Sequence, residues 1–88
     1  MTISQDLFQK ALTLIPGGVN SPVRACKSVQ CEPLFIARAS GSKLTTEDGT
    51  ELIDYVMSCG PMLLGHNHPE VAAAIAATAA NGTSFGAP

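Results

Sequence analysis

The sequence contains no tryptophan, one tyrosine and only three phenylalanines among its 88 residues. Aromatic rings supply a large share of the buried area in protein cores, so their scarcity excludes a large core of the usual kind. Of all residues 45% are hydrophobic, and many of these are alanine. A chain of this length forms at most one small domain, which would bury only about 60% of its unfolded surface. We therefore expect a weak core and a chain that depends on contacts with other protein surface for its stability.

Clustered positive charge is missing as well. The formal net charge is −2, and five basic residues are scattered along the chain: Lys10, Arg24, Lys27, Arg38 and Lys43. Nucleic-acid binding favours a basic stripe, so no nucleic-acid partner is expected. The longest apolar run, at 71–80, is half of the roughly 20 residues that cross a bilayer, and residues 1–10 lack a signal-peptide pattern. The sequence predicts no membrane partner and a cytoplasmic location.

Paired cysteines are also absent. Cys26, Cys31 and Cys59 make an odd number at irregular spacing, which favours free thiols over disulfides. His66 and His68 lie near Cys59, but no Cys-x-x-Cys pair accompanies them. A Cys/His metal module therefore stays an alternative, and the favoured interpretation places His68 at a turn or helix start with no metal bound.

Residues 1–15 show the spacing of an amphipathic helix. Apolar side chains recur at intervals of three and four: Leu7, Phe8, Ala11, Leu12 and Ile15. We expect Ser4 to cap this helix, with Asp6 in its first turn. Pro16 and Gly17 end the pattern, and a constrained loop is expected at 16–32.

Residues 33–57 predict a three-stranded antiparallel meander. A short strand is expected at 33–39, and two more extended stretches flank Asp48-Gly49, a strong β-hairpin signal. Tyr55 and Val56 have high β propensity, so we expect the last strand to include them. Four carboxylates fall on this hairpin: Glu47, Asp48, Glu51 and Asp54. We interpret them as a solvated acidic edge.

A loop, a second helix and a linking segment are expected at 58–88. Pro69 suits the first turn of this helix, and its small-residue face is flat enough for close packing on a neighbour. The fold class predicted for the chain is therefore α+β, with an amino-terminal helix, an antiparallel meander and a following helix.

Arg24 is the candidate binding residue that the spacing singles out. It ends the stretch PGGVNSPVR, in which glycine and proline constrain the path of the loop. Its planar guanidinium suits a carboxylate or phosphate, and the Ser21 hydroxyl lies three residues earlier. Spacing alone leaves two alternatives open, a solvated surface arginine and an anion-binding arginine. Ser58, Cys59 and His66, in the loop before the second helix, are weaker candidates.

Several segments, in order along the chain, carry a resemblance to a known family. They are PGGVNSPVRA at 16–25, LFI at 34–36, TEDGTELIDYV at 46–56, GP at 60–61, LGHNHPEV at 64–71 and GTSFGAP at 82–88. On these motifs the chain resembles the amino-terminal segment of the aminomutases in the class III aminotransferase-like family. These enzymes are pyridoxal-phosphate enzymes of fold type I.

The resemblance implies an isomerase of tetrapyrrole synthesis that converts glutamate 1-semialdehyde to 5-aminolevulinate by intramolecular amino transfer. At the matching positions it implies that Arg24 pairs with the substrate carboxylate and that Ser21 and Val23 lie beside it. Cys59 stands where the family usually has a tryptophan that lines the substrate pocket, so it is included among the substrate-binding residues.

The resemblance also implies a homodimer and a pyridoxal or pyridoxamine 5'-phosphate cofactor in the complete enzyme. The lysine that holds this cofactor is expected beyond Pro88, so we assign no catalytic residue within 1–88. The chain alone is expected to bind no cofactor stably and to be inactive without the rest of its polypeptide. The alternative is a small anion-binding or Cys/His metal module without catalytic activity.

Overall fold

The computed structural model describes residues 2–88, which form two helices, a small sheet and several short 3₁₀ turns. The helices are α1 (Ile3–Leu14) and α2 (Pro69–Ala79), and the strands are β1 (Ile36–Ser40), β2 (Lys43–Thr46) and β3 (Glu51–Ile53). The turns are η1 (Pro16–Gly18), η2 (Pro22–Ala25), η3 (Lys27–Val29) and η4 (Met57–Cys59). The strands form one antiparallel sheet in the order β1-β2-β3. The predicted α+β class is confirmed.

A capping box, rather than the predicted Ser4 cap, begins α1. The Thr2 hydroxyl accepts the N–H of Gln5 at 3.1 Å, and the Gln5 side chain accepts the N–H of Thr2 at 2.8 Å. The prediction for Ser4 was wrong because this residue is buried inside the first turn. Its hydroxyl accepts the N–H of Phe35 at 3.2 Å and so ties α1 to the segment before β1.

The turn between β2 and β3 also reaches α1. The carboxylate of Asp48 accepts the N–H of Ile3 at 2.7 Å and the N–H of Ser4 at 3.1 Å. These N–H groups have no partner inside the helix, and a negative charge at a helix start is favourable. Asp48 is exposed, as the interpretation of a solvated acidic edge expects, but that interpretation did not predict that its carboxylate joins the hairpin to the helix.

Strand β3 ends earlier than predicted. Asp54, the residue after it, accepts the N–H of Val56 at 2.8 Å and the N–H of Met57 at 3.0 Å through one carboxylate oxygen. These bonds turn the chain away from the sheet and into η4. Tyr55 and Val56 consequently lie outside the strand, and their β-forming side chains are exposed.

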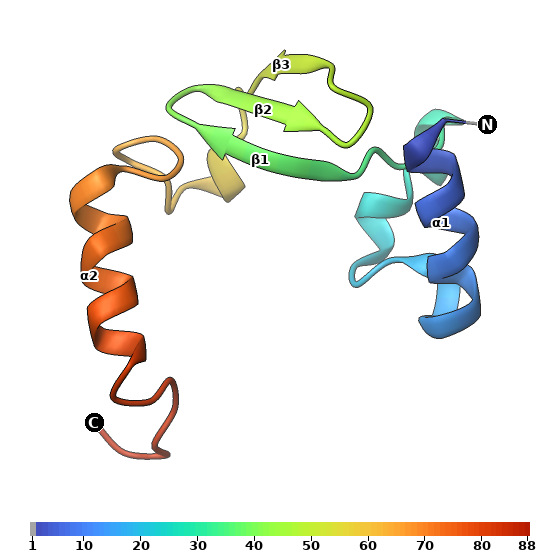
Figure 1. The fold of residues 1–88 in the computed structure, drawn as a ribbon. Helices are drawn as coiled ribbons and strands as arrows, with labels where there is room; N and C mark the ends of the chain where they lie inside the picture. The colour runs from blue at the N-terminus through green and yellow to red at the C-terminus, as the bar shows by residue number, and fades with distance from the viewer. Residues whose placement is uncertain (1) are drawn as a thin grey trace.

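The two helices lie at opposite ends of the sheet and extend to the same side of it, so the chain forms an open arch (Figure 1). Its radius of gyration is 15.6 Å, against about 12 Å for a compact chain of this length. Ala25 is the one buried hydrophobic residue among those described, whereas side chains such as Leu63 and Tyr55 are 91% exposed. The expected weak core is what the structure shows. None of the helices within residues 2–88 combines the length and apolar character needed to cross a membrane.

Candidate substrate-binding site

Arg24 lies in η2, a turn that local sequence holds in place. Ser21 is extended and precedes Pro22, whose fixed φ suits the first position of the turn. The backbone N–H of Arg24 donates to the Ser21 carbonyl at 3.0 Å. Its guanidinium Nη1 donates to Oδ1 of Asn20 at 2.8 Å. A guanidinium carries five N–H donors, so the bond to Asn20 orients the group and leaves further donors for an anion.

The Arg24 turn borders a groove of about 250 Å³ between the end of α1 and the segment before β1. Asn20 and Arg24 supply its polar side chains, and the remaining wall is mostly apolar: Ala11, Ile15, Val19, Pro33, Leu34 and Phe35. A concave site with an apolar wall and a few placed polar groups is typical of small-molecule binding. One cation in such a wall suits a ligand with a carboxylate.

The loop approaches α1 closely because Gly18 has no side chain. Gly18 is buried with φ of +73°, and a Cβ there would lie 2.7 Å from Cε2 of Phe8. A larger residue would be strained by its backbone conformation and would have to displace the Phe8 ring or the loop itself. This contact sets the distance between α1 and the turn that carries Arg24.

The structure brings only part of the predicted substrate set together. Ser21, Val23 and Arg24 lie on one turn, and the Val23 side chain is 87% exposed. Cys59 lies in η4, which is near α2 in Figure 1, whereas η2 lies beside α1. Within residues 2–88 the four residues therefore form two separate groups. Their roles in substrate binding stay predictions.

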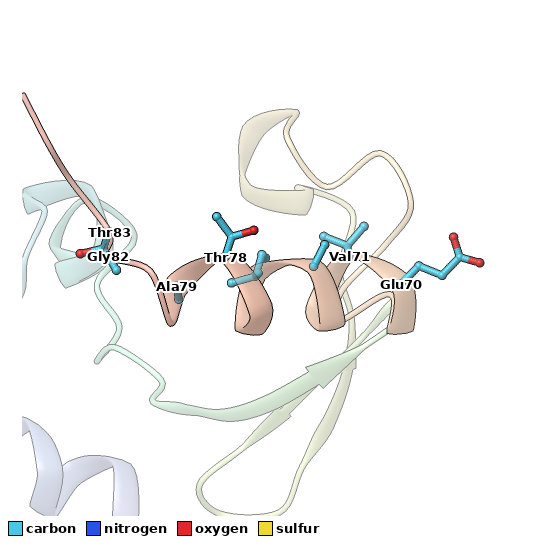
Figure 2. A pocket seen from close by; sticks show the side chains of 8 residues that line it. Glu70, Val71, Thr78, Ala79, Gly82 and Thr83 are labelled. Atoms are coloured by element: carbon cyan, nitrogen blue, oxygen red, sulfur yellow. The ribbon is translucent and has the colours of Figure 1, made fainter. Parts of the chain in front are cut away.

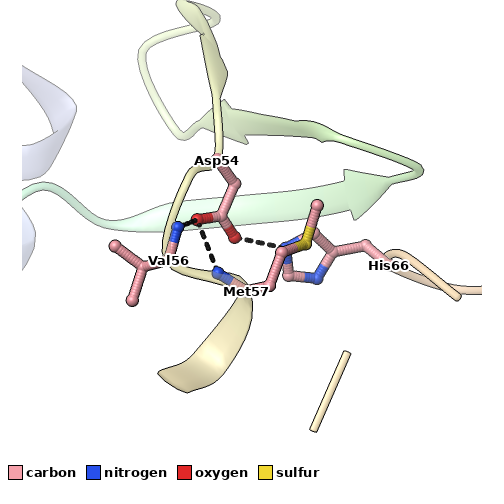
Figure 3. A network of polar contacts seen from close by, with 4 residues as sticks. All are labelled: Asp54, Val56, Met57 and His66. Carbon is pink, nitrogen blue, oxygen red and sulfur yellow. Dashed lines mark hydrogen bonds and ion pairs between the residues drawn. The ribbon is translucent and has the colours of Figure 1, made fainter. Parts of the chain in front are cut away.

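A part-buried polar network that the sequence pattern did not predict lies beside the Cys59 turn. Nε2 of His66 lies 2.6 Å from Oδ2 of Asp54, while Oδ1 of Asp54 accepts the N–H groups of Val56 and Met57 (Figure 3). The hydrogen bond from His66, followed by those from Met57 and Val56, lowers the pKa of Asp54. The solvated-edge interpretation was therefore wrong for Asp54, whose side chain is only 9% exposed.

The third carboxylate with a clear partner is Glu51. It pairs with Lys43 across the β2–β3 ladder at 2.6 Å, and the hydrogen bond from Lys43 lowers the pKa of Glu51. Both side chains are about half exposed, so this pair contributes little to stability.

In the part of the chain that the structure describes, the three cysteines are free thiols, and no cluster of metal-binding side chains is formed. No three His, Cys, Asp or Glu side chains converge there on a point that would hold a metal ion. Cys26 lies beside Cys31 and raises the pKa of the Cys31 thiol through a hydrogen bond. His68 occupies the residue before α2 as predicted, but its side chain accepts no capping bond from the helix N–H groups and its buried Nδ1 has no partner.

One face of α2 is open and apolar. Val71, Ala74, Ile75 and Thr78 line a wide hollow there, with Glu70 at one end and Gly82 and Thr83 at the other (Figure 2). Val71 and Ile75 are 45% and 63% exposed. An apolar face of this kind is normally covered by other protein surface.

Comparison with known proteins defines the class. The family model of the class-III aminotransferases matches residues 25–88, and the chain belongs to this family. Over 85 residues it is 66% identical to the glutamate-1-semialdehyde 2,1-aminomutase of Nitratidesulfovibrio vulgaris (strain DP4), which covers 97% of this chain and 20% of that protein. The enzyme of the same name from Lawsonia intracellularis (strain PHE/MN1-00) is 59% identical over 85 residues. The chain thus spans about a fifth of the length of these relatives.

Solved structures agree with this assignment. A glutamate-1-semialdehyde-aminomutase from Pseudomonas aeruginosa PAO1 matches 97% of the chain with a TM-score of 0.78 and 25% identity, over 18% of its own length. An omega-transaminase from Sphaerobacter thermophilus matches 99% of the chain with a TM-score of 0.80 and 29% identity, over 19% of its own length. The resemblance predicted from the motifs is confirmed, and so is the placement of the fold within the fold type I transaminases.

Proposed function

We propose that this chain is the amino-terminal part of a glutamate-1-semialdehyde 2,1-aminomutase. The complete enzyme would convert glutamate 1-semialdehyde to 5-aminolevulinate by moving an amino group within the substrate. The observation that carries the proposal is the 66% identity over 85 residues to a relative of that name. The groove beside Arg24, with one cation in an apolar wall, supports it from the structure.

In this proposal Arg24 binds the substrate carboxylate. Asn20 holds one edge of the guanidinium, and the remaining donors meet the carboxylate in the forked geometry that arginine favours. Ser21 and Val23 lie on the same turn and contact the substrate next to Arg24. Cys59 contributes to another wall of the pocket once the rest of the polypeptide is in place. Fixing the carboxylate fixes which substrate carbons are presented for reaction.

A pyridoxal or pyridoxamine 5'-phosphate cofactor belongs to the proposed complete enzyme. Solved relatives include a glutamate-1-semialdehyde-aminomutase in complex with PMP and a transaminase with PLP bound. When bound, this cofactor supplies the amine-transfer chemistry. The described residues alone do not fit it, because Lys43 is paired with Glu51 and no lysine lines the Arg24 groove. We therefore assign the cofactor contacts to the rest of the polypeptide and expect no stable cofactor binding by residues 1–88 alone.

The proposed partners are the remainder of the same polypeptide and a second copy of the enzyme, in the cytoplasm. The open arch and the apolar face of α2 support a covering protein surface. No nucleic-acid or membrane partner is proposed.

The test is to purify the complete polypeptide with its cofactor and to measure 5-aminolevulinate formed from glutamate 1-semialdehyde. We expect turnover by the complete enzyme and none by residues 1–88 alone. A cofactor-loaded complete enzyme that forms no 5-aminolevulinate would contradict the proposal. The anion-module alternative predicts instead that residues 1–88 unfold cooperatively and bind a small carboxylate through Arg24.

A further inference from the structure

The turn that carries Cys59 has an unusual backbone. Met57, Ser58 and Cys59 have φ values of 47°, 54° and 64°, three successive non-glycine residues in the left-handed region. Residues with side chains visit this region singly, because their Cβ atoms crowd the following carbonyl. Such a run persists only where surrounding contacts over-determine it, and such strain gathers at functional sites.

Asp54 and His66 supply those contacts. One carboxylate oxygen of Asp54 accepts the N–H groups of Val56, the residue before the left-handed run, and of Met57, its first residue (Figure 3). The other carboxylate oxygen lies 2.6 Å from Nε2 of His66. The side chains of Asp54 and His66 are only 9% and 14% exposed, so water competes little for these bonds.

The pair is anchored to the sheet at both of its ends. The N–H of Asp54 donates to the Ser42 carbonyl at 2.8 Å. His66 forms a backbone bridge with Gly41, with N–H to carbonyl distances of 2.8 Å and 2.9 Å. The turn between β1 and β2 therefore holds both Asp54 and His66, and these two hold the start of η4.

We propose that Asp54 and His66 are positioning residues that set the conformation of the Met57–Cys59 turn and thereby aim Cys59 at the substrate. The claim about the turn stands on the contacts alone, whereas the claim about the substrate rests on the proposed function. Neither side chain is proposed to touch the reacting atoms.

The test compares Asp54→Ala and His66→Ala with conservative variants in the complete, cofactor-loaded enzyme. Asp54→Asn keeps an acceptor oxygen for the two N–H groups, and His66→Gln keeps an N–H donor near the position of Nε2. Glu51→Gln is the control, because its carboxylate lies on β3, three residues before Asp54, but pairs with Lys43 and is 59% exposed. The first readout is the alkylation rate of Cys59 by iodoacetamide, resolved by peptide mass spectrometry, with Cys26 and Cys31 as internal references. The second readout is the steady-state kinetics with glutamate 1-semialdehyde, which shows whether a variant changes KM, kcat or both.

We expect both alanine variants to change the Cys59 alkylation rate by about tenfold relative to Cys26 and Cys31, because the turn loses the hydrogen bonds that fix the surroundings of this exposed thiol. KM for glutamate 1-semialdehyde is expected to rise by about tenfold or more, since small misplacements of a binding wall are costly. The conservative variants should keep the Cys59 alkylation rate and the KM close to those of the parent enzyme. Unchanged Cys59 alkylation, or a parallel change at all three cysteines, would overturn the positioning role. If the parent enzyme lacks aminomutase activity, the proposed function fails while the alkylation result still decides the inference.

Discussion

The carboxylate of Asp48 accepts the N–H of Ile3 at 2.7 Å, across 45 positions of sequence. Its second oxygen accepts the N–H of Ser4, so a hairpin turn caps the first turn of α1. Burial opposes ionisation of Asp48, but the hydrogen bonds from Ile3 and from the Ser4 side chain and backbone outweigh it and lower its pKa. The two hydrogen bonds to Asp48 attach α1, which borders the Arg24 groove, to the β2–β3 hairpin of the sheet.

Replacing Asp48 by alanine removes this link. We expect Asp48→Ala to lower the thermal unfolding midpoint of the complete enzyme by about 2–4 °C, because two helix-start N–H groups lose their acceptor. Glu47→Ala is the matched control, since it removes a neighbouring exposed carboxylate that caps no helix. Differential scanning calorimetry of both variants checks this, and equal midpoints would contradict the capping role.

The same carboxylates predict how stability depends on pH. The pKa values of Asp48 and Asp54 are lowered in the folded state. Their stabilising contribution is therefore complete above the unfolded value of about 4, and it is lost as the pH falls through the lower folded values. We expect the difference in unfolding midpoint between the parent enzyme and an Asp48→Asn, Asp54→Asn double variant to be constant above about pH 5 and to narrow below about pH 4. A difference that is independent of pH would contradict these assignments.

Gly49 and Gly65 have nearly the same φ but different surroundings, so substitutions there distinguish the cost of backbone strain from the cost of a steric contact. A Cβ at Gly65 (φ +83°) would lie 3.0 Å from the Gly41 carbonyl oxygen, whereas a Cβ at Gly49 (φ +85°) would meet nothing within 4 Å. We expect Gly49→Ala to cost about 1 kcal/mol of stability, from backbone strain alone. Gly65→Ala should cost about 3 kcal/mol, because the backbone of Gly41 cannot move aside easily. Thermal unfolding of the two variants checks the difference, and equal losses would show that the contact near the His66 bridge is unimportant.

Local patterns in the sequence predicted the order of elements. The apolar spacing of 1–15, the Asp48-Gly49 turn and the Pro69 helix start each reflect near-neighbour physics, and the structure follows them. The capping box at Thr2 and Gln5 was also visible as a Thr-x-x-Gln pattern, and the prediction of Ser4 overlooked it.

Contacts between distant residues could not be predicted in this way. The spacing of Asp48 and Asp54 indicates solvent-exposed side chains on a hairpin. Only the folded chain brings them into contact with Ile3 and His66. The same limit applies to the candidate site. Arg24 became a candidate because proline and glycine constrain its loop, whereas nothing local relates that loop to the left-handed turn at Cys59.

The central claim, that the Arg24 turn binds the substrate carboxylate of an aminomutase, is tested most directly by steady-state kinetics of Arg24→Ala in the complete enzyme. Arg38→Ala, on the exposed face of β1, is the control. We expect KM for glutamate 1-semialdehyde to rise by about tenfold to a hundredfold, as the loss of a charge-assisted hydrogen bond predicts, with the absorbance of the bound cofactor unchanged. An Arg24→Ala enzyme with the KM and kcat of the parent would contradict the claim.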